Sequence, residues 1–110
     1  MKTQSARILR IHISESDRYG GQPLFEAIVA KCRQLNIAGA TVFQGLEGYG
    51  DSAELHRAHL IRNDRPIVIV IVDIPENLDR LVPAVEEMLD TCVLATSDAE
   101  MTRVQKDGKL

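Results

Sequence analysis

The sequence predicts an α+β fold with the element order β-α-β-β-α-β, the ferredoxin-like arrangement in which an antiparallel sheet carries both helices on one face. Residues 7–14 alternate as a strand does, and residues 67–73 form an almost continuous apolar strand. Two other segments carry apolar residues at helical spacing, and each opens near a proline. We expect residues 1–110 to form a single domain, because a chain of this length encloses one modest core.

The first half of the chain is predicted to form a strand, a loop and a helix, followed by the glycine-containing strand described below. Alternation over residues 7–14 predicts one face with Leu9, Ile11 and Ile13 and an opposite face with Ile8, Arg10 and His12. Residues 15–21 are polar and end in glycine, so we expect a loop whose charged side chains form a solvated, self-paired turn. The helix opens at Gln22-Pro23 and continues to about Asn36, with the apolar stripe Leu24, Ala27, Ile28, Cys32 and Leu35.

The second half follows the same plan. Residues 51–57 fit a loop or a helical turn, and residues 58–62 are expected to re-enter the sheet. Strand 67–73 leads into a helix that opens at Pro75 and contains Pro83. Since proline costs about 3 kcal/mol inside a helix, we expect a kink or a split there. The last strand is predicted at residues 92–95, with residues 100–104 extending it or forming another and residues 105–110 as a flexible tail.

Composition and charge narrow the classes of function. The apolar content of 45% is ordinary for a soluble globular protein, and the net charge of −3 disfavours general nucleic-acid binding. We expect no signal peptide and no membrane insertion, because the first residues are polar and the longest apolar run is residues 67–72. Cys32 and Cys92 lack metal-binding or redox spacing, which indicates buried thiols in a cytoplasmic protein.

Three glycines end the strand that begins at Thr41-Val42-Phe43. Gly45 lies inside the strand pattern, which predicts a bulge or the close approach of another group. Gly48 and Gly50 flank Tyr49, and glycines in such a segment let a phosphate or sugar come close to backbone N–H groups. A bulged hairpin without a ligand is the alternative.

The strand at residues 67–72 is apolar on both faces, although two helices cover only one face of a four-stranded sheet. The other face of the sheet must therefore be buried against another group. A second copy of the chain is the interpretation that we favour, because most soluble oligomers are symmetric assemblies of one chain. The chain's own tail is the alternative.

No catalytic constellation appears in the sequence. His12 is interpreted as an interface or packing residue. His56 and His59 stand three residues apart, and Asp51 and Glu54 could join them at a metal, but no further histidine or cysteine is near. No nucleophile is paired with a base, and no dinucleotide or phosphate-loop motif occurs.

The combined pattern resembles the PII signalling proteins. It consists of Gly39-Ala-Thr-Val42, Gly48-Tyr-Gly50, a polar segment and the strand after Pro66. More closely, Glu15-Ser-Asp-Arg18, Pro23-Leu-Phe-Glu-Ala-Ile28 and Gly39-Ala-Thr-Val42 resemble a family of short PII-like proteins, over roughly residues 7–104. The resemblance implies a non-catalytic homotrimer with inward-facing sheets, an adenine nucleotide in the clefts between subunits, and a mobile loop at residues 51–65 that docks on a transporter or an enzyme.

Site residues follow from the resemblance by position. Thr41, Gly48, Tyr49 and Gly50 match the strand-end part of the cleft, and Arg103 matches a basic residue that faces the phosphates from a neighbouring subunit. Together with Gly45, these are the predicted ligand-binding residues.

The chain departs from PII proteins in ways that bear on the ligand. Residues 90–97 lack the glycine- and lysine-rich phosphate segment, so AMP, ADP or cyclic AMP fits better than ATP. Gln105 stands where a second arginine is common, and the strand before Gly48 holds one extra residue. The loop at residues 51–65 is shorter and lacks the modified tyrosine.

Three alternatives remain open. The first is a metal-responsive trimer resembling the divalent-cation-tolerance proteins, with His56 and His59 as ligands. The second is a small enzyme that uses Glu47 or Asp51 at the cleft. The third is a structural oligomer whose cleft stays empty.

Overall fold

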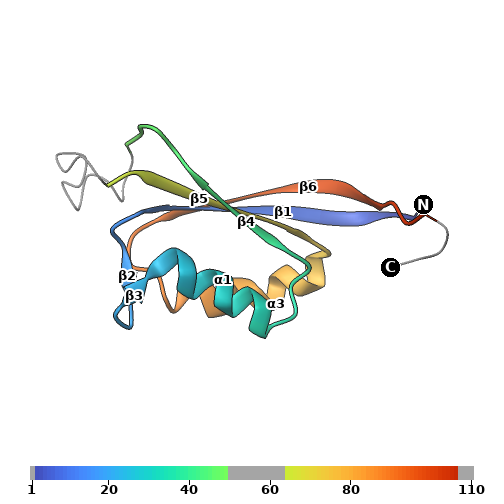
Figure 1. The fold of residues 1–110 in the computed structure, drawn as a ribbon. Coiled ribbons are helices and arrows are strands. Elements are labelled where there is room, and N and C mark those ends of the chain that lie inside the picture. The colour runs from blue at the N-terminus through green and yellow to red at the C-terminus, as the bar shows by residue number, and fades with distance from the viewer. Residues whose placement is uncertain (1, 50–63, 107–110) are drawn as a thin grey trace.

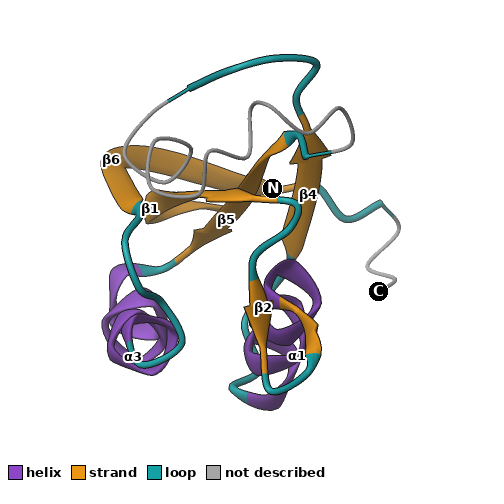
Figure 2. Ribbon diagram, turned by 90° about the vertical axis from the view of Figure 1, so that its left-hand side faces the viewer, coloured by secondary structure: helices purple, strands orange, loops and turns teal. Residues whose placement is uncertain are grey.

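The computed structural model describes residues 2–49 and 64–106. In these residues the elements are β1 (Lys2–Ser14), β2 (Arg18–Tyr19), β3 (Gln22–Pro23), α1 (Leu24–Gln34), β4 (Ala40–Gln44), β5 (Pro66–Asp73), α3 (Pro75–Glu86) and β6 (Val93–Arg103). The main sheet has the strand order β4-β5-β1-β6, and each neighbouring pair is antiparallel. Both helices lie on one face of this sheet (Figures 1 and 2). The predicted ferredoxin-like fold is thereby confirmed.

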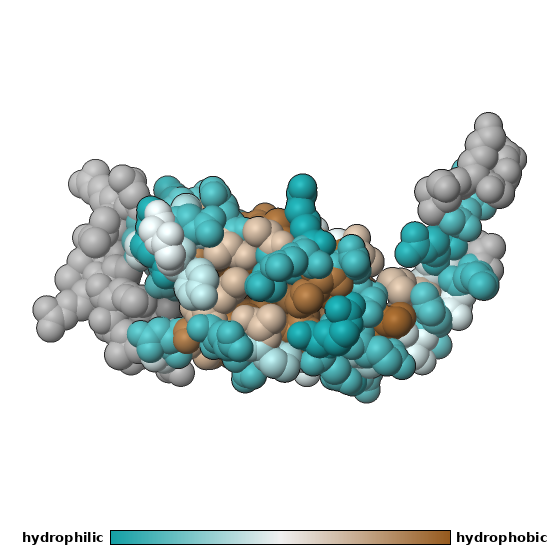
Figure 3. Space-filling model, turned by 90° about the horizontal axis from the view of Figure 1, so that it is seen from below, coloured by the Kyte–Doolittle hydropathy of each residue, from teal (hydrophilic) through white to brown (hydrophobic). Residues whose placement is uncertain are grey.

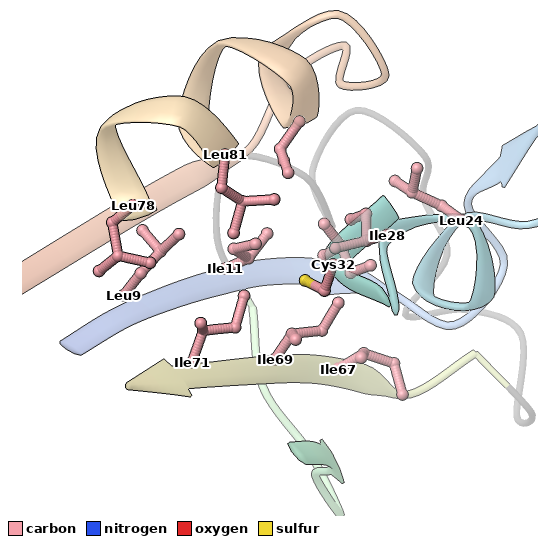
Figure 4. Close-up of a cluster of buried hydrophobic side chains, with 12 residues drawn as sticks. Leu9, Ile11, Leu24, Ile28, Cys32, Ile67, Ile69, Ile71, Leu78 and Leu81 are labelled. Atoms are coloured by element: carbon pink, nitrogen blue, oxygen red, sulfur yellow. The ribbon is translucent and has the colours of Figure 1, made fainter. Parts of the chain in front are cut away.

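The core lies between the sheet and the two helices. Ile67, Ile69 and Ile71 of β5 are almost fully buried. The β1 residues that pair with them, Ile13, Ile11 and Leu9, are equally buried. Figure 4 shows these side chains meeting the buried stripes of α1 and α3: Leu9, Ile11, Ile67, Ile69 and Ile71 from the sheet, and Ile28, Cys32, Leu78 and Leu81 from the helices. Full burial of each large aliphatic side chain contributes about 1.5–3 kcal/mol.

Helix α3 passes through Pro83 as one helix, so a split does not occur. The proline costs about 3 kcal/mol by removing one helical hydrogen bond. Leu78, Leu81 and Val85 are fully buried on either side of it. Their burial contributes about 1.5–3 kcal/mol each, which exceeds the cost of the proline.

Strands β1 and β6 are longer than predicted. β1 begins at Lys2, and β6 is one strand that reaches Arg103 and pairs with β1 along its whole length. Because β5 pairs with β1 only as far as Arg7, the two strands continue beyond the sheet as a two-stranded ribbon. We call residues 2–5 and 100–103 the β1–β6 arm (Figure 1). The side chains of the arm are mostly polar and show no alternation of apolar and polar residues. The arm is held together by backbone pairing between β1 and β6.

The segment after β1 is a small hairpin rather than an irregular loop. Tyr19 pairs with Gln22, and Gly20 and Gly21 form the turn between them with φ of 59° and 82°. Two consecutive positive φ angles match the right-handed twist of a tight hairpin, and glycine adopts them without strain.

Asp73 ties the end of α1 to the start of α3. It is 4% exposed, and its carboxylate accepts hydrogen bonds from the backbone N–H groups of Ala38 and Ile74 at 2.9 and 2.7 Å. The side-chain amide of Asn77 donates a third, at 3.0 Å. These bonds satisfy a buried charge and fix the connection from which β4 departs.

Candidate functional site

The predicted strand-end residues lie on and beyond β4, an edge strand of the sheet. Val42 pairs with Ile69, whose side chain faces the helices, so Thr41 and Phe43 point to the opposite face, which we call the open face. Thr41 pairs with Val70, and Phe43 is 55% exposed. Thr41 is therefore accessible to a molecule at the open face.

Gly45 continues the ladder in register, so the predicted bulge is wrong. The β4 residues pair one to one with β5 in an unbroken antiparallel register from Ala40 to Gln44, and the Gly45 N–H donates to the Pro66 carbonyl oxygen at 2.7 Å. A Cβ at Gly45 would lie 2.8 Å from Cγ of Pro66, and one at Gly48 would lie 3.3 Å from the same atom. Close approach of the chain to the proline ring thus explains Gly45.

Beyond Gly45 the chain turns outward. Leu46 and Tyr49 are 89% and 88% exposed, and Glu47 is exposed as well. Gly50, the remaining strand-end residue of the prediction, lies outside the described residues. Two large apolar side chains in this position are available to a ligand or a second subunit.

Glu15 joins the two chain segments that lead into and out of residues 50–63. Its carboxylate accepts hydrogen bonds from the Gln44 side-chain amide at 2.8 Å and from the Arg65 N–H at 3.4 Å. Its own N–H donates to the Arg65 carbonyl oxygen at 2.8 Å, and the next N–H, of Ser16, donates to Asp64 at 3.0 Å. The sequence predicted that the charged side chains of this turn pair with one another. Glu15 instead bonds to Gln44 and Arg65, which are distant in sequence, and residue spacing does not reveal such partners.

Arg103 lies at the other edge of the sheet. It ends β6, is exposed and pairs with Lys2 in the β1–β6 arm. Strands β5 and β1 lie between β6 and β4, so one chain does not bring Arg103 to Gly45 or Gly48. The predicted site residues therefore form two separate groups on each chain.

The open face has an apolar centre. Val68, Val70 and Val72 of β5 are half-buried there beside Ile8 of β1, and Phe43 and Val93 extend the apolar surface to the two edges. Arg10 and His12 also lie on this face, as predicted, and Arg10 donates to the Ser97 hydroxyl at 3.4 Å. The prediction that β5 is apolar on both faces is confirmed.

The opposite face of the molecule, which carries the helices, has an apolar band and a shallow groove. Figure 3 shows hydrophilic residues around a central apolar band over the helices. A shallow groove there is lined by α1 and the edge strand β4, with Phe25, Val29 and Val42 among its residues. It lies on the face opposite Thr41 and was not predicted.

The thiols of Cys32 and Cys92 are poor nucleophiles. Burial raises the pKa of the Cys32 thiol to about 11. Burial and the nearby Asp17 carboxylate raise the pKa of Cys92 as well. Both thiols therefore stay protonated near neutral pH, and the thiol is a much weaker nucleophile than the thiolate.

Within residues 2–49 and 64–106, no group of three or more His, Cys, Asp or Glu side chains is placed to hold a metal ion. His56, His59, Asp51 and Glu54 lie outside that part of the chain. No helix in the described residues is long and apolar enough to cross a membrane.

Comparison with known proteins gives a family. Residues 6–101 match DUF190, described as "Uncharacterized ACR, COG1993". The UPF0166 protein MJ1524 of Methanocaldococcus jannaschii is 36% identical over 86 residues, which are 76% of this chain and 79% of the relative. A UPF0166 protein of Aquifex aeolicus is 28% identical over 88 residues, covering 78% of this chain and 84% of the relative.

Solved structures show the same fold. CPII from Thiomonas intermedia K12, bound to ADP and bicarbonate, superposes with a TM-score of 0.67 at 19% identity, covering 93% of both chains. CPII bound to ADP, AMP and acetate gives a TM-score of 0.65 at 17% identity and 94% coverage of both. CPII is described as a nitrogen regulatory PII-like protein.

Proposed function

The chain belongs to the DUF190 family, and from that premise we propose that it is a non-catalytic, PII-like signalling protein that binds an adenine nucleotide. Support for the nucleotide comes from CPII, which shares the fold and is bound to ADP and AMP. Support for signalling rather than catalysis comes from the site itself. Its predicted residues are a hydroxyl, glycines, a tyrosine and an arginine, which bind phosphates and stack on rings but offer no paired base and nucleophile.

The observation that carries the proposal is the division of the site between the two sheet edges. Thr41, Gly45, Gly48 and Tyr49 belong to the β4 edge, whereas Arg103 belongs to the β6 edge. A head-to-tail ring brings the β4 edge of one subunit to the β6 edge of the next, and a closed ring of three also faces the open faces inward. The homotrimer thereby completes three equivalent sites and buries the valines of β5.

The ligand would lie with its phosphate between the two edges. The Arg103 guanidinium donates to phosphate oxygens from one subunit, and backbone N–H groups near Gly48 and Gly50 donate from the other. Residues 90–97 contain no lysine, arginine or glycine to hold further phosphates. AMP, ADP or cyclic AMP is therefore preferred over ATP.

Control of a partner would depend on residues 51–65. Gln44, at the end of β4 before this segment, and Arg65, its last residue, are both hydrogen-bonded to the Glu15 carboxylate. A nucleotide bound at Gly48 changes the conformation of residues 45–49, next to these bonds. Residues 51–65 then bind or release a transporter or an enzyme. The ligand shifts that equilibrium only by its difference in affinity between the two states of the segment.

The deciding experiment measures thermal unfolding of the purified protein with AMP, ADP, ATP, cyclic AMP and cyclic di-AMP. A nucleotide at 100 times its dissociation constant adds roughly 2.7 kcal/mol to the stability of the folded form, which raises the unfolding temperature clearly. We expect AMP, ADP or cyclic AMP to produce this rise. No rise with any nucleotide would refute the proposal. A rise with Cu²⁺ or Zn²⁺ that His59→Ala abolishes would favour the metal-responsive alternative.

A further inference from the structure

Phe43 is an aromatic residue of the edge strand β4 that is not among the predicted ligand-binding residues. Its side chain lies on the open face, the same face as Thr41, and is 55% exposed. In the described strands of the main sheet, residue 43 is the only aromatic position. A large apolar side chain that is this exposed at a sheet edge is available to a partner or a ligand.

The open face of β4 presents Thr41, Phe43 and Gly45 in one row. Successive members of the row are two residues apart on a strand, which corresponds to about 7 Å. Phe43 pairs with Val68, and the Gly45 N–H donates to the Pro66 carbonyl oxygen, so the row lies beside apolar residues of β5. Phe43 therefore stands between a hydroxyl and a glycine, next to an apolar surface.

The Pro66 ring connects this row to Gly48. Its Cγ atom would lie 2.8 Å from a Cβ at Gly45 and 3.3 Å from one at Gly48. Both glycines thus contact the same ring, and Phe43 is the next residue of the row after Gly45. A group that extends from a phosphate at Gly48 along the edge of the open face would reach the Phe43 ring.

The Phe43 ring is suited to a flat aromatic ligand. Nucleobases stack on aromatic side chains, and loss of one such side chain weakens binding by roughly 5- to 150-fold. Tyr49 is the other aromatic residue near the glycines, but it is 88% exposed and lies beyond the β4–β5 ladder. Phe43 belongs to that ladder, so less freedom is lost when a ligand binds to it.

We propose that Phe43 stacks on the base of the bound nucleotide, so that the base lies on the open face of β4 and the phosphate at Gly48. This inference rests on the proposed function, because it requires that the chain binds a nucleotide. Every base has a face that can stack. Phe43 therefore explains why a nucleotide binds more tightly than a sugar phosphate, and other groups select adenine.

A fluorescent reporter at residue 43 tests the position of the base. The chain contains no tryptophan, so Phe43→Trp introduces a single indole. A base that stacks on an indole quenches its fluorescence. We expect AMP, ADP or cyclic AMP to quench it with the dissociation constant that calorimetry gives for the same variant. D-ribose 5-phosphate, which has a sugar and a phosphate but no base, should not quench it.

Phe25 provides the matched control, because it is the only other phenylalanine of the chain. It lies on α1 and lines the groove with Val42, on the opposite face of β4. Phe25→Trp therefore places an indole near the same strand but away from the proposed base. Its fluorescence should stay constant through the same titrations.

Two further variants separate stacking from apolar packing. Phe43→Leu keeps an apolar side chain but removes the ring, and it should weaken AMP about tenfold or more. Its affinity for D-ribose 5-phosphate should not change. Phe43→Tyr keeps the ring and should bind AMP like the unsubstituted chain. Light scattering should give the same mass for all three proteins, which separates base binding from a role in assembly.

Three results would overturn the inference while the proposed function stands. One is nucleotide binding that leaves the fluorescence of Phe43→Trp unchanged. Another is unchanged AMP affinity in Phe43→Leu. The third is a loss of affinity in Tyr49→Ala as large as that in Phe43→Leu, which would place the base at Tyr49. If no adenine nucleotide binds to the unsubstituted chain, the proposed function and this inference fail together.

Discussion

Cγ of Pro66 lies 2.8 Å from the position that a Cβ atom would take at Gly45. The two residues are also joined by the hydrogen bond from the Gly45 N–H to the Pro66 carbonyl oxygen, at 2.7 Å. The proline ring therefore packs on the backbone at the end of β4, where the predicted nucleotide site begins. Gly45 has a structural reason to be glycine even without a ligand.

Gly45→Val should destabilise the fold by about 1–3 kcal/mol, because the added side chain forces the Pro66 ring and the β4–β5 pairing apart. Chemical denaturation measures the change in the free energy of unfolding. Gly39→Ala is the control, since a Cβ there meets nothing within 4 Å. Equal stability of both variants would show that the ring yields without cost.

A site shared between subunits predicts complementation. Gly48→Leu should block the β4 part of the site and Arg103→Gln the β6 part, so neither variant trimer should be stabilised by the preferred nucleotide. In a co-refolded mixture, some interfaces pair an intact Gly48 with an intact Arg103, and the thermal shift should partly return. Size-exclusion chromatography should show that both variants still form the proposed trimer. A mixture that exchanges subunits and still fails to respond would contradict the shared site.

The open face should be essential for assembly. Val70→Glu places a carboxylate at the centre of that face, opposite Arg10 of β1. Burying this charged pair in an apolar interface costs more in desolvation than the pair returns, so the proposed trimer should dissociate. Light scattering measures the mass in solution. Gln34→Glu adds the same charge at an exposed position of α1 and should leave the mass unchanged. A Val70→Glu trimer would mean that the face is not the interface.

Asp73 and Asp79 should differ sharply in their contribution to stability. Asp73→Ala removes the acceptor of the Ala38 and Ile74 N–H groups, whose hydrogen bonds are partly buried, and should cost about 1–3 kcal/mol in total. Asp79→Ala removes the 3.1 Å ion pair with Arg7, in which the Asp79 side chain is 71% exposed, and should cost at most about 1 kcal/mol. Urea denaturation of both variants compares them directly, and similar losses would refute this ranking.

Cys32 should make stability fall in alkaline solution. Its pKa is raised from 9.0 to about 11 in the folded state, so the unfolded chain loses this proton first. The stability it contributes is complete below about pH 9 and is lost between about pH 9 and 11. Cys32→Ala should lower stability at neutral pH through lost packing and show a shallower decline over that interval. Parallel declines in urea midpoint would contradict the assignment.

Several parts of the structure could be predicted because they depend on local pattern. The stripes that begin at Leu24 and Leu78 and the alternation of Leu9, Ile11 and Ile13 mark the faces that the core buries. The strand after Pro66 also revealed the apolar open face. The length of β6 and the hairpin after β1 were missed, because exposed polar strands have no hydrophobic period.

The sequence by itself determined the fold class, the order of the elements and the apolar character of both faces of β5. Each of these follows from the pattern of apolar side chains that folding buries away from water. Only the tertiary structure decided which distant residues meet. It separated Arg103 from Gly48 by two intervening strands, placed Pro66 against Gly45 and joined Glu15 to both Gln44 and Arg65. The physical reason is that hydrogen-bond partners and ring contacts depend on chain register and packing, and neither leaves a periodic signal in the sequence.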